Sequence, residues 1–324
     1  MGVAKWDMAQ ETTTELAHGL CGVLGVSSVQ NLRRLSGGAS RETWRFEAGG
    51  DEMVLQRVRP GRPDGLGAEP AVLKAAFAAG VPVPEIVVDG SQSVELSLPF
   101  MIVRAVDGET IARKILRDDE YATARANLPA QLGDAAARLH AIDASSISGL
   151  TSHDQVDMYR RVLDDLGEPH PVFEIAFRWL ETNRPPSTGM RLVHGDFRLG
   201  NLMVDSNGLA AVLDWELAHI GDPMEDLGWL CVRAWRFGGH GPVAGIGTYE
   251  ELFDAYERAS GTRPDPGVVR WWQILGTLKW GIMCIGQANT HLSGVARSHE
   301  LAAIGRRVCE NEYDLVHLLR EELS

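Results

Sequence analysis

Residues 192–216 read Leu192-Val193-His194-Gly195-Asp196-Phe197-Arg198-Leu199-Gly200-Asn201-Leu202-Met203-Val204-Asp205-Ser206-Asn207-Gly208-Leu209-Ala210-Ala211-Val212-Leu213-Asp214-Trp215-Glu216, two apolar runs on either side of an Asn-Gly pair. Asn207-Gly208 predicts a hairpin turn, because both residue types tolerate a positive φ. Counting outward from the turn pairs Asn201 with Asp214, so we expect these two side chains at the same open end of the hairpin. Asp205, at the shoulder of the turn, is expected to cap the loop.

The polar residues at that end of the hairpin have the chemistry of a phosphoryl-transfer site. The amide oxygen of Asn201 and the carboxylate of Asp214 suit a hard cation such as Mg²⁺, which shares its oxygen ligands with phosphates. Asp196 precedes them on the adjoining loop and could accept the proton of an attacking hydroxyl while the metal ion neutralises the phosphates. Polar residues also gather at ordinary turns. Here, however, a candidate base and two candidate metal ligands follow one another around a single hairpin in the order that kinases use, which favours the catalytic interpretation.

The composition indicates a globular protein and excludes several classes. The chain has 324 residues, 44% of them hydrophobic, and a net charge of −13 without an obvious basic patch, so we expect no nucleic-acid partner. Its four cysteines form no CxxC pair, which argues against a disulfide framework or a zinc site and favours a cytoplasmic location. The N-terminus lacks a signal pattern and the apolar stretch 275–285 is interrupted by Gly and Lys, so we expect no membrane partner. The sequence leaves open whether the protein forms a homodimer.

Hydrophobic periodicity divides the chain into a sheet-rich and a helix-rich part. The first hundred residues predict helices at 11–25 and 68–79 and strands at 31–36, 42–48, 52–58, 85–89 and 98–104. After a short linker near 104–108 the pattern becomes helical, at 127–142, 155–167 and 172–182, and from 224 to the end. The stretch 271–288 is apolar enough for a buried helix.

With these motifs the sequence resembles the aminoglycoside phosphotransferase and choline kinase group, including the kinase-like domain of acyl-CoA dehydrogenase fusion proteins. The family motif H-G-D-x-x-x-x-N, followed by an Asp that ends the next strand, is matched by His194, Gly195, Asp196, Asn201 and Asp214. The resemblance implies a bilobed, protein-kinase-like α+β fold, with a nucleotide-binding N-lobe at 1–104 and a helical C-lobe at 105–324 that holds the catalytic loop, metal site and acceptor pocket. It also implies ATP and Mg²⁺, a small hydroxylated substrate, Asp196 as base and Asn201 and Asp214 as metal ligands.

The resemblance extends to candidate nucleotide-binding residues upstream. Gly38 and Ser40 lie in a stretch that is similar to the family's phosphate loop. No Lys occurs at 52–58, where such kinases carry one, so Arg57 is the expected replacement, with Arg59 second; relatives that read V-L-R-R would put Gln56 at that position instead. Glu69 is expected to pair with this cation, or to be an exposed Glu that favours the helix dipole.

The stretch 101–108 resembles the hinge that receives adenine. Val103 would lie beside the base, and Arg104 and Val106 would offer main-chain hydrogen bonds. Downstream, Asp226 in a G-D-P-x-x-D-L segment is expected to brace the catalytic loop. Residues expected to be structural rather than catalytic are His140, His194, Trp271, Trp272, Trp280 and Met283.

Two other functions stay open at this point. A nucleotide-binding pseudokinase that acts as a partner-binding module would explain the missing Lys and the non-standard glycine loop. A protein kinase is disfavoured because no A-P-E follows Asp214. The acceptor is not specified by these motifs, and the acidic balance of the chain mildly favours a cationic or neutral one.

Overall fold

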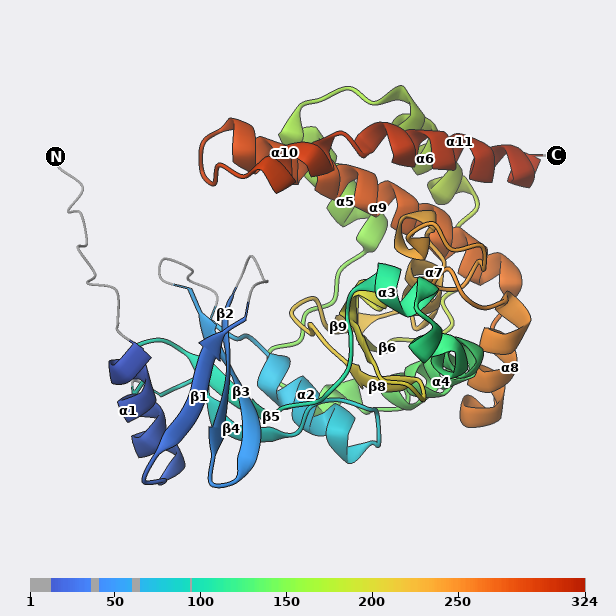
Figure 1. Cartoon of the computed structure of the whole chain (residues 1–324). Coiled ribbons are helices and arrows are strands. Elements are labelled where there is room, and N and C mark those ends of the chain that lie inside the picture. The colour runs from blue at the N-terminus through green and yellow to red at the C-terminus, as the bar shows by residue number, and fades with distance from the viewer. Residues whose placement is uncertain (1–12, 36–40, 60–64, 94, 324) are drawn as a thin grey trace, which may run out of the picture. The chain divides into compact units, whose positions relative to one another are not determined.

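The computed structural model describes residues 13–35, 41–59, 65–93 and 95–323 (Figure 1). The chain forms two compact units. Unit 1 comprises the described residues up to Phe77 together with Pro84–Val106, and unit 2 comprises Ala78–Val83 and the described residues from Asp107 onward.

Unit 1 is built on an antiparallel sheet with the strand order β1-β2-β3-β5-β4. Its elements are α1 (Thr13–Leu24), β1 (Val29–Arg34), β2 (Arg41–Ala48), β3 (Asp51–Val58), α2 (Glu69–Ala78), β4 (Ile86–Gly90) and β5 (Phe100–Arg104). Leu16 and Leu20 of α1 pack against Phe46, Leu55 and Phe100 of the sheet. Each buried leucine contributes roughly 1.5–3 kcal/mol, so this helix is held mainly by its apolar stripe. The predicted small sheet is confirmed, with one helix before its first three strands and one helix after them.

Unit 2 is mainly helical. Its helices are α3 (Ala112–Arg117), α4 (Ala122–His140), α5 (Gln155–Leu166), α6 (Pro171–Thr182), α7 (Met224–Leu230), α8 (Tyr249–Ser260), α9 (Pro266–Leu292), α10 (His299–Gly305) and α11 (Val308–Leu323). Its short strands are β6 (Arg191–Val193), β7 (Leu202–Val204), β8 (Leu209–Val212) and β9 (His219–Gly221), and its 3₁₀ turns are η1 (Asp119–Tyr121), η2 (Ala144–Ser146), η3 (Leu199–Asn201) and η4 (Arg233–Arg236).

Helix α9 is the centre of the core of unit 2. It begins at Pro266, and the carboxylate of Asp265 caps it by accepting the N–H groups of Gly267 and Val268. Its apolar residues pack against α5, α6 and α11, as the arrangement in Figure 1 also shows. Trp271 and Trp280 of this helix are buried, as predicted. In the described part of the chain no helix combines the length and the apolar character needed to cross a bilayer.

The predicted hairpin is present, but its register differs from the expected one. Leu202 pairs with Val212, and an irregularity follows Met203, so Asn201 lies opposite Leu213 rather than Asp214. The N–H of Leu213 donates to the carbonyl of Asn201 at 2.8 Å. The bond from the N–H of Asp205 to the carbonyl of Gly208 centres the turn between Ser206 and Asn207, one residue earlier than expected. The extra residue of β8 between Leu209 and Ala211 offsets only half of the resulting shift in pairing.

Local hydrogen bonds close the turn of this hairpin. Gly208 supplies a positive φ of 143°. Asp205 Oδ1 accepts the N–H groups of Asn207 and Gly208 at 2.7 and 2.9 Å, so the expected capping role of Asp205 is confirmed.

Candidate active site

The loop 194–201, called the HGD loop below, is held in place by the buried carboxylate of Asp226. Asp226 of α7 accepts the backbone N–H groups of His194 and Gly195 at 2.8 and 2.9 Å, and its Oδ2 lies 3.1 Å from Nε2 of His140. His140 in turn contacts the hydroxyl of Tyr256 at 3.0 Å. The bracing role predicted for Asp226 is therefore confirmed, and His140 serves as its partner.

His194 organises the loop as a neutral side chain. The N–H of Asp196 donates to Nδ1 of His194 at 3.1 Å, and Nε2 lies 3.0 Å from the carbonyl of Leu213. Nδ1 is thus the acceptor and Nε2–H the donor, which defines one tautomer. Burial lowers the pKa of His194 from its ordinary value, in agreement with a neutral ring. The ring links the HGD loop to the strand end just before Asp214.

Three donors orient the carboxylate of Asp196. Its Oδ1 accepts the indole N–H of Trp229 at 2.7 Å and Nε–H of Arg198 at 2.9 Å. Its Oδ2 accepts the amide of Asn201 at 2.6 Å. A carboxylate oxygen has two lone pairs, so Oδ2 keeps one acceptor position for a further hydroxyl. The carboxylate is therefore positioned before any substrate arrives, as a general base requires.

Asn201 contacts this carboxylate, and Asp214 follows Leu213, whose backbone is bonded to both Asn201 and His194. The amide nitrogen of Asn201 is bonded to both the carbonyl and the carboxylate of Asp196, which turns its Oδ1 away from them. Asp214 is exposed and has a φ of 66°, a left-handed conformation that costs a non-glycine residue about 1 kcal/mol. Strained backbone at such a position is typical of functional residues. An amide oxygen and a carboxylate fit Mg²⁺.

A buried lysine supports the other side of the HGD loop. Lys279 of α9 donates to the carbonyl of Gly195 at 2.9 Å and to Oε1 of Glu225 at 3.3 Å. Its ammonium also lies 4.6 Å from the ring centre of Trp229, within the range of a cation–π interaction. Burial alone would lower the pKa of Lys279, but the surrounding acidic groups, Glu225 among them, raise it, so the side chain is charged.

In unit 1 the structure separates the residues that were expected to act together. Side chains alternate between the two faces of a strand, and Arg57 shares its face with Leu55, which packs under α1. Its guanidinium bonds the carbonyl of Leu96 at 3.3 Å and Glu42 at 3.0 Å. These contacts give Arg57 a structural role, and Gln56 occupies the other face of β3.

The cation that the structure brings to Glu69 comes from β2. Arg41 forms a buried ion pair with Glu69 at the start of α2. Phe46 and Ala48 are the core-facing residues of β2, so Arg41 projects from the opposite face, the one that Gln56 also occupies. Glu69 is buried rather than an exposed first-turn residue. The second candidate cation, Arg59, donates to the carbonyl of Arg41 at 3.3 Å.

The remaining predicted nucleotide residues are only partly described. Gly38 and Ser40 lie outside the described residues. Val103 is buried in β5, Arg104 is exposed and Val106 is half-buried. The N–H of Arg104 donates to the carbonyl of Glu85 at 2.8 Å, so this N–H is already used inside unit 1.

Sequence reasoning missed four residues of this arrangement, namely Arg41, Arg198, Trp229 and Lys279. Arg198 follows Asp196 by two positions, which is a local signal that could have been read. Trp229 and Lys279 reach the loop from 33 and 84 residues away, and only the fold brings them there.

Comparison with known proteins identifies the family of this chain. Residues 31–272 match the phosphotransferase enzyme family APH. The chain belongs to this family. Acyl-CoA dehydrogenase family member 11 of Gallus gallus is 28% identical over 319 residues, which cover 88% of this chain and 40% of that protein. The chain therefore spans about two fifths of the length of this relative.

Solved structures of the phosphotransferase family show the same fold. A putative aminoglycoside phosphotransferase of Ralstonia eutropha superposes with a TM-score of 0.76, at 20% identity over 96% of this chain and 98% of that chain. Aminoglycoside phosphotransferase APH(4)-Ia, in a ternary complex with ADP and hygromycin B, has a TM-score of 0.64, at 20% identity over 94% and 98% of the two chains. The expected kinase-like α+β fold is confirmed, and family and fold together support small-molecule phosphotransfer.

Proposed function

We propose that this phosphotransferase moves the γ-phosphoryl group of ATP to a hydroxyl of a small molecule. The observation that carries the proposal is the setting of Asp196, whose carboxylate is oriented by Trp229, Arg198 and Asn201 and keeps an acceptor position on Oδ2. Folding alone requires neither a carboxylate that is held in this way nor the left-handed backbone of Asp214.

In phosphoryl transfer the protein mainly positions the two reactants and stabilises the negative charge of the phosphates. Asp196 Oδ2 accepts the hydrogen bond of the substrate hydroxyl and takes its proton as the oxygen attacks. The new oxygen–phosphorus bond forms on the γ-phosphorus, the bond to the bridging oxygen breaks, and ADP leaves with that oxygen. Asp226 and Lys279 keep the loop in place during the reaction through the backbone of His194 and Gly195.

The residues present fit a magnesium ion. Asn201 Oδ1 and the carboxylate of Asp214 would hold it, and it would supply neutralisation of the phosphate charge. We assign the phosphates to Gly38, Ser40 and Arg41, with Glu69 orienting the Arg41 guanidinium. Arg41 thereby takes the place first expected for Arg57. Adenine is assigned to the stretch Val103–Val106, through Val103, the carbonyl of Arg104 and the main chain of Val106.

A pseudokinase remains the second function to test, because residues 52–58 contain no lysine. Formation of ADP is followed in a coupled assay with Mg²⁺ and a panel of amino alcohols, aminoglycosides, macrolides and hydroxyacyl compounds. We expect turnover with at least one acceptor and a loss of about 100-fold or more in Asp196→Asn. Activity that is equal in the two proteins refutes the role of Asp196. ATP binding without turnover on any acceptor favours the partner-binding module.

A further inference from the structure

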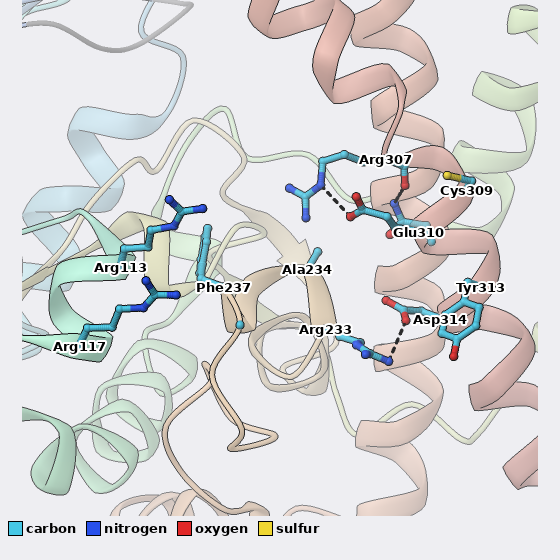
Figure 2. Close-up of a pocket in the computed structure, with 12 residues that line it drawn as sticks. Arg113, Arg117, Arg233, Ala234, Phe237, Arg307, Cys309, Glu310, Tyr313 and Asp314 are labelled. Atoms are coloured by element: carbon cyan, nitrogen blue, oxygen red, sulfur yellow. Dashed lines mark hydrogen bonds and ion pairs between the residues drawn. The ribbon is translucent and has the colours of Figure 1, made fainter.

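Unit 2 contains a pocket of about 900 Å³ whose walls carry four arginines (Figure 2). It is called the arginine pocket below. Arg113 and Arg117 approach from α3, and Arg233 and Arg307 come from η4 and from the turn before α11, on the other side of Phe237. Arg113 and Arg117 are one helical turn apart, but Arg233 and Arg307 lie more than 100 residues further along the chain, so no local motif indicated this group.

The arginine pocket has an excess of positive charge. Arg233 pairs with Asp314 at 3.3 Å, and Arg307 pairs with Glu310 at 3.1 Å. Within the described residues, neither Arg113 nor Arg117 has a carboxylate partner. Four guanidinium groups therefore face two carboxylates in a chain whose net charge is −13. A local surplus of positive charge against that background attracts anions.

The short segment around η4 connects the arginine pocket to the candidate active site. Phe237 and Arg233 line the pocket, and Trp235 lies between them in sequence. Trp235 packs against Trp229 with ring centres 5.1 Å apart and the rings tilted by 55°, and the guanidinium of Arg198 lies 4.5 Å from the ring centre of Trp235. Trp229 and Arg198 are the two side chains that hold Oδ1 of Asp196. The same segment thus contacts both places.

The lining chemistry favours a ligand with one anionic end. Guanidinium groups bind carboxylate and phosphate oxygens through parallel hydrogen bonds. Phe237 and Ala234 add apolar surface between the arginines, against which a carbon skeleton can pack. A cationic amine would instead meet the unpaired charges of Arg113 and Arg117.

We propose that the arginine pocket binds the anionic group, a carboxylate or a phosphate, of the acceptor whose hydroxyl is phosphorylated. This inference rests on the proposed function, because it names the class of acceptor. It reverses the mild expectation of a cationic or neutral acceptor, which came from the charge of the whole chain rather than from one pocket.

Four probes with a common three-carbon skeleton test the inference. Glycerate carries a carboxylate, glycerol 2-phosphate a phosphate, glycerol no charge and serinol an ammonium group. Binding is measured by calorimetric titration, and kcat/KM with ATP is measured for the same four compounds. The proteins are the full chain, the double variant Arg113→Gln/Arg117→Gln, and Arg258→Gln, which removes an exposed arginine of α8 outside the pocket. Arg113 and Arg117 are exposed, so the double variant is expected to fold.

We expect at least one anionic probe to bind more tightly than glycerol and serinol, with the stronger of the two identifying carboxylate or phosphate. The double variant should weaken that binding about tenfold, Arg258→Gln should not, and added salt should weaken it in the full chain. Equal binding of anionic and neutral probes, or an unchanged double variant, overturns the inference. Arginine-dependent binding without phosphoryl transfer to any acceptor instead refutes the proposed function, and transfer without anion preference refutes the inference alone.

Discussion

Glu69, the first residue of α2, forms a buried ion pair with Arg41, the first residue of β2. The pair places a guanidinium on the face of the sheet that Gln56 shares, whereas Arg57 points into the core under α1. Among the described residues of unit 1, Arg41 is thus a cation oriented by a carboxylate of α2, which is why we propose it as the phosphate-binding arginine.

Substitution of the two arginines should separate nucleotide binding from stability. We expect Arg41→Met/Glu69→Gln, which leaves no buried carboxylate unpaired, to raise the KM for ATP about tenfold or more, because a phosphate contact is lost. Arg57→Met should leave this KM within about twofold and lower the free energy of unfolding by about 1–3 kcal/mol, because Glu42 and the carbonyl of Leu96 lose a charged partner. Steady-state kinetics and urea denaturation measure both quantities. A raised KM for ATP in Arg57→Met, with an unchanged KM in Arg41→Met/Glu69→Gln, would instead assign the phosphate contact to Arg57.

Lys279 should act on the reaction through the position of Gly195. In Lys279→Met the carbonyl of Gly195 loses its donor and Glu225 loses a buried cation. We expect kcat to fall about 10- to 100-fold because the HGD loop shifts, with the KM for ATP nearly unchanged. The free energy of unfolding should fall by about 3–5 kcal/mol, as for other buried pairs that lose one partner.

A second variant distinguishes two roles of Lys279, the positioning of Gly195 and the neutralisation of Glu225. Lys279→Met/Glu225→Gln removes both charges and should recover most of the stability, since His219 can still bond the new amide. It should not recover kcat, because the donor to Gly195 is still missing. Recovery of kcat together with stability would show that Lys279 acts only by neutralising Glu225.

The free energy of unfolding should fall as the pH drops from about 6.5 to about 5. The pKa of His194 is lowered by burial, so below about 6.5 the unfolded chain binds a proton that the folded chain does not, at a cost of up to about 1.4 kcal/mol per pH unit. For His219, burial lowers the pKa but Glu225 raises it, and the net direction is upward. Its contribution to stability is fully present below about 6.5 and is lost as the pH rises through the raised pKa.

Denaturation of His194→Asn in urea across this pH range checks the assignment. The variant should show a flatter dependence on pH than the full chain, because the titrating ring is gone. His18→Asn, which removes an exposed histidine of α1, serves as the control and should keep the original slope. A slope that survives in His194→Asn would place the responsible group elsewhere.

The sequence predicted the local features of this site and missed the distant ones. Asp196, Asn201 and Asp214 lie on one loop and hairpin, so their order along the chain and the Asn-Gly turn were sufficient to group them. The register was wrong by one residue because the turn is centred one residue before the Asn-Gly pair, and the extra residue in β8 offsets only half of that shift.

Contacts between elements far apart in the sequence could not be predicted in the same way. The burial of Arg57 could not be predicted because it depends on which face of β3 meets α1, and a half-buried strand with polar residues on both faces does not specify this. Lys279 gave no signal, since a lysine inside an apolar helix gains its partners only when the HGD loop packs on α9.

The indole of Trp229 should contribute to catalysis through a single hydrogen bond. Trp229→Phe keeps most of the buried ring and removes the N–H that lies 2.7 Å from Oδ1 of Asp196. We expect kcat to fall about tenfold, because one of the groups that preorganise the carboxylate is lost, while the KM for ATP stays within about twofold. Trp280→Phe is the matched control, since Trp280 is buried in the same cluster and its N–H has no hydrogen-bond partner among the described residues. A rate in Trp229→Phe equal to that of the control would mean that Arg198 and Asn201 suffice to orient Asp196, and the rate of Arg198→Met would then be expected to fall further than that of either tryptophan variant.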